Sequence, residues 1–106
     1  MKSKLDTNSA RTLKINETKH AINGGHGDVD LTPREFDLLT CLVDHAGDPL
    51  TRTELLSTAW EWDNAAELKT KTVDMHIRRL RMKFEQAGID PKHISTIRGR
   101  GYAYIA

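Results

Sequence analysis

The chain has 106 residues, of which 38% are hydrophobic and 29% are charged, and its formal net charge is +1. These values are typical of one globular domain with a modest core, and they argue against a disordered chain. No apolar run approaches the roughly 20 residues of a membrane span, and the polar stretch MKSKLDTNSA is unlike a signal peptide. A single cysteine excludes an internal disulfide framework, so we expect a cytoplasmic protein.

The charges are divided unevenly along the chain. Residues 69–106 contain nine lysines and arginines against three acids, which makes this part +6 and leaves −5 for residues 1–68. A chain of this kind can present a cationic face to a polyanion while it stays near neutral as a whole. The asymmetry alone is equally consistent with an ordinary charged surface.

The first third of the chain predicts a tail followed by a small sheet. Residues 1–10 lack apolar periodicity, so we expect a linker or tail there and one domain over residues 11–106. Between residues 12 and 31, the short alternating stretches LKIN, HAIN and VDL are separated by the turn sequence NGGHG. This pattern predicts an antiparallel sheet with tight turns.

Two helix starts follow with the same residue pattern. In LTPREF, Thr32 stands at the N-cap position and Glu35 follows three residues later. In LTRTEL, Thr51 and Glu54 repeat that spacing. Both stretches predict a capping box, in which each side chain bonds the other residue's backbone N–H. We expect one helix that ends near Ala46 and a second, shorter helix that ends near Trp60.

A third helix is predicted over residues 71–87, before Gly88. At 100° per residue, one stripe of this helix is apolar and should be buried. Its members are Val73, Ile77, Leu80 and Phe84. The opposite side centres on Lys71, Met75, Arg78 and Met82, with Thr72 and Arg79 on one shoulder and Asp74 and Arg81 on the other. An ion pair between Asp74 and Arg78 is possible at this spacing.

The outward side of the third helix has two interpretations. An amphipathic surface helix with a solvated polar side is the ordinary one. Two features favour a binding face instead, because no acid occurs from Met75 to Lys83 and because two methionines point outward beside the arginines. Arginine can bond the O6 and N7 atoms of guanine, and an apolar side chain can contact a thymine methyl group. The pattern therefore favours entry into a DNA major groove.

The last stretch, ISTIRGRGYAYI, predicts a hairpin over residues 94–105. Arg98 and Arg100 stand on its turn, where Gly99 and Gly101 permit tight backbone geometry. A basic hairpin tip beside a basic helix can reach phosphates or a narrow minor groove. A charged turn that only favours solubility is the alternative.

Four stretches of the chain together resemble one known family. LTPREFDLL, LTRTELLSTAW, KTVDMHIRRLRMKF and ISTIRGRGYAYI occur in the order and near the spacing of the effector domain of OmpR/PhoB-type response regulators. The resemblance implies an α+β winged helix-turn-helix. Its parts would be an N-terminal antiparallel four-stranded sheet, a three-helix core and a C-terminal β-hairpin wing.

The resemblance also implies roles for individual residues in binding duplex DNA. The third helix would be the recognition helix, and Arg79 is the first choice for a base contact. Its groove-facing or phosphate-contacting positions would be Lys71, Thr72, Met75, His76, Arg78, Arg79, Arg81 and Lys83. For His76, packing without any DNA contact is the alternative. Thr51, Arg52 and Trp60 match positions used against the DNA backbone, and Arg98 or Arg100 would approach the minor groove.

The same resemblance implies partners. The connector over residues 61–70 is similar to a loop through which some relatives touch RNA polymerase, and its candidate contacts are Glu61, Trp62, Asp63 and Glu67. For Trp62, covering the core is the alternative. Two copies are expected head to tail on tandem DNA repeats, with a monomer off DNA. A receiver domain is expected in the full-length protein, although a one-component regulator without a receiver also fits. A winged helix that binds an acidic protein partner is a further alternative.

Enzyme and metal chemistry find little support in the sequence. Cys41 and His45 are four residues apart on a helix, but no other His or Cys is near them in the sequence, and zinc sites usually need three or four ligands. The chain has no nucleophile motif and no phosphate-binding glycine loop. We therefore expect a protein that is not an enzyme and that needs no cofactor.

Overall fold

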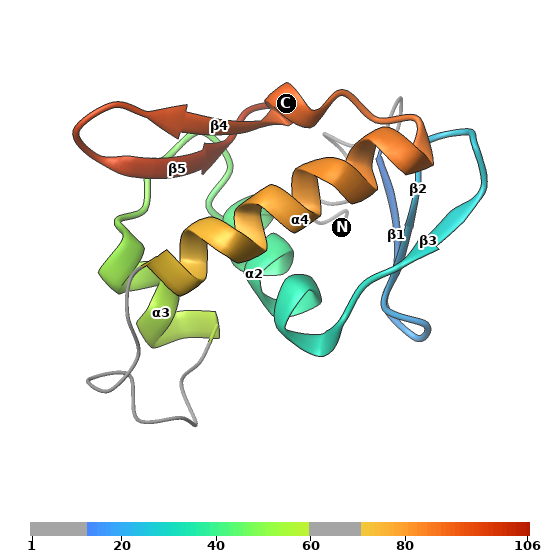
Figure 1. The fold of residues 1–106 in the computed structure, drawn as a ribbon, viewed down its shortest axis with the longest axis horizontal. Coiled ribbons are helices and arrows are strands. Elements are labelled where there is room, and N and C mark those ends of the chain that lie inside the picture. Colours follow the sequence, from blue (N-terminus) through green and yellow to red (C-terminus); the bar gives the residue numbers. More distant parts are fainter. Residues whose placement is uncertain (1–12, 60–70) are drawn as a thin grey trace, which may run out of the picture.

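The computed structural model describes residues 13–59 and 71–106. Along the chain a small sheet comes first, a group of helices follows, and a hairpin comes last (Figure 1). In chain order they are β1 (Lys14–Asn16), β2 (Ala21–Asn23), β3 (Asp28–Asp30), α2 (Pro33–Asp44), α3 (Arg52–Ala59), α4 (Lys71–Ala87), the 3-10 helix η2 (Pro91–His93), β4 (Ile94–Ile97) and β5 (Gly101–Tyr104). The predicted α+β winged helix-turn-helix class is confirmed.

The N-terminal sheet has three strands in the part of the chain that the structure describes, so the expectation of four is wrong. Its order is β1-β2-β3, with Ile22 at the centre opposite both Ile15 and Val29 in antiparallel register. Each strand has only three residues, so the alternating stretches between residues 13 and 31 supply three strands and no more. A fourth strand would have to come from the predicted tail, which lies outside the described residues.

Both predicted capping boxes are present. At the start of α2, the hydroxyl of Thr32 accepts the N–H of Glu35 at 3.2 Å, and the Glu35 carboxylate accepts the N–H of Thr32 at 2.9 Å. At the start of α3, Thr51 and Glu54 make the same two bonds at 3.0 and 2.8 Å. Each box satisfies two backbone donors that the first turn of a helix leaves unpaired.

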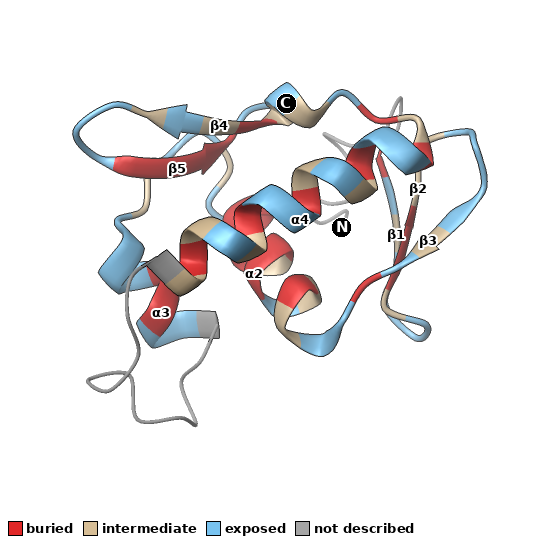
Figure 2. Ribbon diagram, viewed as in Figure 1, coloured by how far each residue is buried: buried red, intermediate tan, exposed pale blue. Residues whose placement is uncertain are grey.

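The apolar stripe of α4 is buried as predicted. Val73, Ile77, Leu80 and Phe84 have no exposed surface. Figure 1 shows α4 running from α3 at its N-terminal end to the sheet at its C-terminal end, and Figure 2 shows the buried positions alternating with exposed ones along it. The carbonyl oxygen of Ala87, at the end of α4, accepts the N–H of Gly24 at 2.8 Å, so the turn between β2 and β3 caps this helix.

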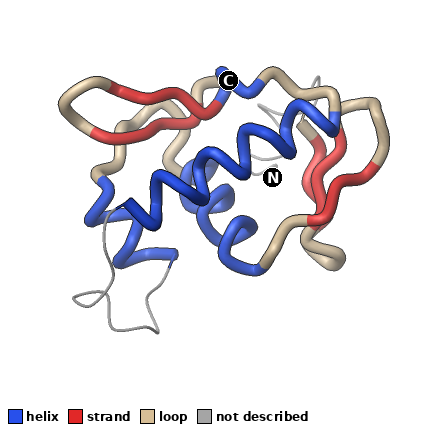
Figure 3. The backbone as a smooth tube through the Cα atoms, viewed as in Figure 1, coloured by secondary structure: helices blue, strands red, loops and turns tan. Residues whose placement is uncertain are grey.

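The hairpin formed by β4 and β5 is attached to the segment that leads into α3 (Figure 3). Leu50 and Tyr102 exchange two backbone hydrogen bonds, at 2.8 and 2.9 Å. Gly101 has a φ of +145°, and a Cβ atom added there would lie 2.0 Å from the carbonyl oxygen of Leu50. Only glycine permits this approach, so the position of the hairpin relative to α3 depends on it.

Neither a membrane helix nor a metal centre is found in the part of the chain that the structure describes. None of its helices is long and apolar enough to cross a membrane. No three His, Cys, Asp or Glu side chains come together there as metal ligands would. Burial raises the pKa of the Cys41 thiol, and the Nδ1 atom of His45 lies 2.9 Å from the backbone carbonyl oxygen of Cys41.

Candidate nucleic-acid interface

The outward side of α4 presents a mixed cationic and apolar surface, which we call the outer face and define as Met75, Arg78, Arg79 and Met82. Each of the two methionines is 52% exposed, and both arginines are exposed. Neither arginine forms a hydrogen bond or ion pair within residues 13–59 and 71–106. The buried stripe on the opposite side of α4 holds this surface outward.

A second basic region lies between the start of α3 and the turn of the hairpin. Arg98 and Arg100 are exposed on this turn, which the backbone N–H of Arg100 closes on the carbonyl oxygen of Ile97 at 2.9 Å. Residues 96–101 and Arg52 line a cavity of about 390 Å³ there. Arg52 at the start of α3 and the two arginines of the hairpin turn therefore line the same cavity. They come together because the hairpin is bonded to Leu50, just before α3.

Arg52 is connected to both α4 and the hairpin. Its Nε donates to Oδ1 of Asp74 at 2.7 Å, and the hydroxyl of Tyr102 donates to the same oxygen at 2.5 Å. Burial alone would raise the pKa of Asp74, but the bonds from Tyr102 and Arg52 bring it below its ordinary value. The possible pair between Asp74 and Arg78 is therefore not the one that forms.

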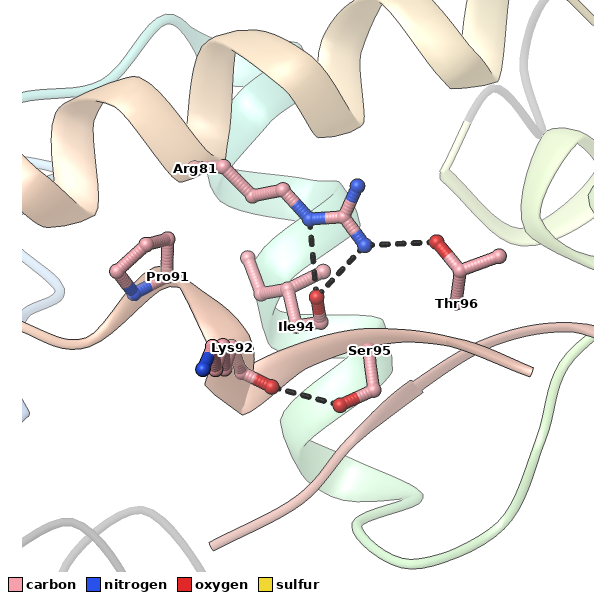
Figure 4. Close-up of a pocket in the computed structure, with 6 residues that line it drawn as sticks. All are labelled: Arg81, Pro91, Lys92, Ile94, Ser95 and Thr96. Carbon is pink, nitrogen blue, oxygen red and sulfur yellow. Dashed lines mark hydrogen bonds between the residues drawn. The ribbon is translucent and has the colours of Figure 1, made fainter.

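Arg81 does not extend from α4 as the resemblance implies. Its Nε and Nη2 donate to the carbonyl oxygen of Ile94 at 2.9 and 2.7 Å, and Nη2 also donates to the Thr96 hydroxyl at 2.9 Å (Figure 4). The guanidinium is thus bound to β4 at the edge of a pocket of about 400 Å³. The structure places Arg81 between α4 and the hairpin, where it supports the hairpin.

Lys83 also has a structural partner. Its Nζ donates to Oε1 of Glu35, whose side chain is only 2% exposed. Burial alone would raise the pKa of Glu35, but hydrogen bonds from Lys83 and Thr32 and the charge of the lysine lower it below its ordinary value. The lysine therefore joins α4 to the capping box of α2 and is turned away from the outer face.

The remaining predicted contacts are distributed around these features. Thr51 is exposed, and its hydroxyl is used in the cap of α3. Thr72 and His76 are half-buried, with Nδ1 of His76 located 2.8 Å from the carbonyl oxygen of Thr72. Trp60, the side chain of Lys71 and the connector over 61–70 with its Glu61, Trp62, Asp63 and Glu67 lie outside the described residues.

Sequence reasoning missed the role of Tyr102. The alternation of ISTIRGRGYAYI shows that its ring can be buried, but no linear spacing relates it to Arg52 or Asp74. The one available signal is chemical, because a buried tyrosine hydroxyl needs a hydrogen-bond partner. Only the fold identifies that partner.

The comparison with known proteins accords with this geometry. Residues 26–104 match the family described as "Transcriptional regulatory protein, C terminal". The chain belongs to this family. One relative, described as the uncharacterized transcriptional regulatory protein YkoG of Bacillus subtilis, is 41% identical over 91 residues. That alignment covers 86% of this chain and 39% of YkoG, so the chain spans about two fifths of this relative.

Two solved effector domains have the same fold. One is described as the DNA binding domain of the response regulator AdeR in complex with an intercistronic region; it has a TM-score of 0.73, 26% identity, and coverage of 89% of this chain and 93% of that one. The other is the RstA DNA-binding domain of Klebsiella pneumoniae in complex with the RstA box, with a TM-score of 0.70, 30% identity, and coverage of 89% and 91%. In this winged-helix fold β4 and β5 form the C-terminal hairpin.

Proposed function

We propose that this chain is the output domain of a two-component response regulator and that it binds duplex DNA in a sequence-specific way. The observation that carries the proposal is the outer face of α4, where Arg78 and Arg79 stand beside two half-exposed methionines. The DNA complexes of AdeR and RstA, whose folds this chain shares, support it.

Sequence would be read by the outer face in the major groove. The groove is about 12 Å wide and admits an α-helix, and arginine can bond guanine O6 and N7 there. Arg79 is our first choice for such a contact, and Arg78 is its neighbour. Met75 and Met82 supply apolar atoms for thymine methyl groups. Because the two arginines are not paired with described protein side chains, their donors are available to DNA.

The DNA backbone would be bound on both sides of the outer face. Thr51 and Arg52 lie at the start of α3, where the helix dipole and the backbone N–H groups that the capping box does not use favour a phosphate. Arg98 and Arg100 in the wing would approach the adjacent minor groove or its phosphates. Arg52 and the wing turn line one cavity, which supports two proposed contacts that lie close to each other.

The remaining candidates divide into two groups. Arg81 and Lys83 support the fold in this proposal, because their donors are bound to Ile94, Thr96 and Glu35. The further candidate contacts that we retain are Trp60, Lys71, Thr72 and His76.

We also propose partners that act beyond the DNA contact. Two copies would bind tandem repeats head to tail, with a monomer off DNA, and the connector over residues 61–70 would touch RNA polymerase. A receiver domain would accompany this domain in the full-length protein, which would act in the cytoplasm as a regulator and not as an enzyme. That the chain spans about two fifths of YkoG is consistent with a further domain.

Selection of bound duplexes from a random pool, followed by titration of the winning duplex and a scrambled one, tests the proposal. We expect saturable binding that favours the selected sequence and that falls by about 0.9 in log K per neutralised phosphate for each unit of log salt. A winged helix that binds an acidic protein partner would give no saturable duplex binding at moderate salt. That result would refute the proposed function.

A further inference from the structure

Asp74 stands in an unfavourable place for a DNA-binding helix. It is the only acid between Lys71 and Phe84, and its side chain is 39% exposed in the first turn of α4. A carboxylate beside DNA phosphates opposes binding unless a cation compensates for it. The helix dipole stabilises an acidic side chain at this position. The dipole does not explain, however, which residues the carboxylate of Asp74 contacts.

The contacts of Asp74 join three elements. Its Oδ1 accepts the Nε–H of Arg52 from α3 at 2.7 Å and the hydroxyl of Tyr102 from β5 at 2.5 Å. Its Oδ2 has no hydrogen bond to any residue that the structure describes. The carboxylate therefore lies where the helix-turn-helix meets the wing.

The ring of Tyr102 extends this connection. The guanidinium carbons of Arg52 and Arg81 each lie 5.6 Å from the centre of the ring, within the range of a cation–π contact. Arg81 is bound in turn to the carbonyl oxygen of Ile94 in β4. Tyr102 therefore contacts both Arg52 and Asp74, and it connects them to the wing.

Arg52 is bonded to Asp74 through Nε, and its side chain also interacts with the hydroxyl of Tyr102. The side chain is nevertheless 45% exposed at the start of α3. A long side chain that is already held in place loses less conformational entropy when it binds a phosphate. An arginine held through Nε can still offer its other N–H groups to a phosphate.

We propose that Asp74 is a positioning residue, which holds Arg52 toward the DNA backbone and ties it to the wing through Tyr102. The inference rests on the proposed function, because it assumes that Arg52 contacts a phosphate. It explains why an acid is present in the first turn of the recognition helix. The electrostatic cost of the carboxylate is offset by the preorganisation of one phosphate contact.

Two substitutions separate charge from positioning. Asp74→Ala and Asp74→Asn remove the same charge, but asparagine keeps an oxygen that can accept from Arg52 and Tyr102. We expect Asp74→Ala to weaken binding to the selected duplex roughly tenfold, in the range of coupling between contacting residues, and Asp74→Asn to weaken it less. Glu85→Gln, an exposed acid further along α4, is the charge control and should strengthen binding slightly.

The same substitutions in an Arg52→Ala background decide the mechanism. There the carboxylate has no arginine to hold and only repels phosphate, so Asp74→Ala should strengthen binding. Strengthening in both backgrounds would show that Asp74 acts only as a repulsive charge, and weakening in both would show that Asp74 supports binding independently of Arg52. Either result would overturn the inference.

A spectroscopic measurement on the free protein completes the test. The Nε–H resonance of Arg52 should be observable and separate from those of Arg78 and Arg79 in the wild type, and should merge with them in Asp74→Ala. An unchanged resonance would contradict the positioning role. Thermal unfolding of each variant checks that the fold is intact. If the wild type binds no duplex, the proposed function fails; if it binds and this resonance does not respond, only the inference fails.

Discussion

Replacing Lys83 with methionine tests whether this lysine serves the fold or the DNA. Methionine keeps an unbranched stem of similar length, so the substitution chiefly removes the charge and the hydrogen bond to Glu35. Glu35 is then left as a carboxylate with a 2% exposed side chain and without its cation. We expect Lys83→Met to destabilise the domain more than it weakens DNA binding.

The magnitude follows from the burial of the two partners. Breaking a fully buried pair costs about 3–5 kcal/mol. Lys83 is 24% exposed, and Glu35 keeps its bond from the N–H of Thr32, so the cost should be smaller. We expect a loss of about 2 kcal/mol in the free energy of unfolding at pH 7, which corresponds to a fall of roughly 10 °C in Tm for a domain of this size.

The loss in free energy of unfolding caused by Lys83→Met should be larger at pH 7 than at pH 4. The pKa of Glu35 is lowered in the folded wild type, so the ionised pair stabilises the fold above the unfolded value of about 4.3 and ceases to do so as the pH falls through the folded value. Without Lys83 only the bonds with Thr32 oppose the effect of burial, so the pKa of Glu35 should be higher than in the wild type and protonation should relieve part of the cost. The difference between variant and wild type should therefore shrink from pH 7 to pH 4.

Urea unfolding followed by circular dichroism at pH 7, 5 and 4 measures this difference. Lys14→Met, which replaces an exposed lysine on β1, is the matched control and should change stability by no more than about 0.5 kcal/mol. A Lys83→Met variant as stable as this control at pH 7, or one whose loss is the same at pH 4, would refute the reasoning.

Three further substitutions test the interface. Arg79→Ala should weaken the binding free energy for the selected duplex by about 1–3 kcal/mol and relax base choice at one position. If the variant keeps the full preference for the selected duplex over scrambled DNA, Arg79 does not make the base contact. Arg52→Ala should weaken binding to all duplexes nearly equally and lower the salt slope by about 1, as titrations at several salt concentrations would show. Gly101→Ala should lower the free energy of unfolding by about 2 kcal/mol or more, since its Cβ would meet the carbonyl oxygen of Leu50; calorimetry with unchanged Tm would contradict this.

The elements predicted correctly are those that depend on neighbours in the sequence. A capping box involves residues three apart, so Thr32 with Glu35 and Thr51 with Glu54 predicted both helix starts. The apolar stripe of α4 follows from a spacing of three and four residues, which the helix itself imposes. The sheet was overcounted because the resemblance implied four strands, whereas the alternating stretches between residues 13 and 31 form three.

The sequence by itself determined the fold class, the outward direction of Met75, Arg78 and Arg79, and the basic turn of the wing. Only the tertiary structure decided which cations on α4 are free. A helical projection places Arg79, Arg81 and Lys83 all outside the buried stripe, yet Lys83 and Arg81 meet Glu35 and Ile94, which lie 48 and 13 residues away in the chain. The position of a residue on a helix gives the direction of its side chain. The partner of that side chain depends on which other element packs beside the helix, and this is decided by contacts between residues that are distant in the sequence.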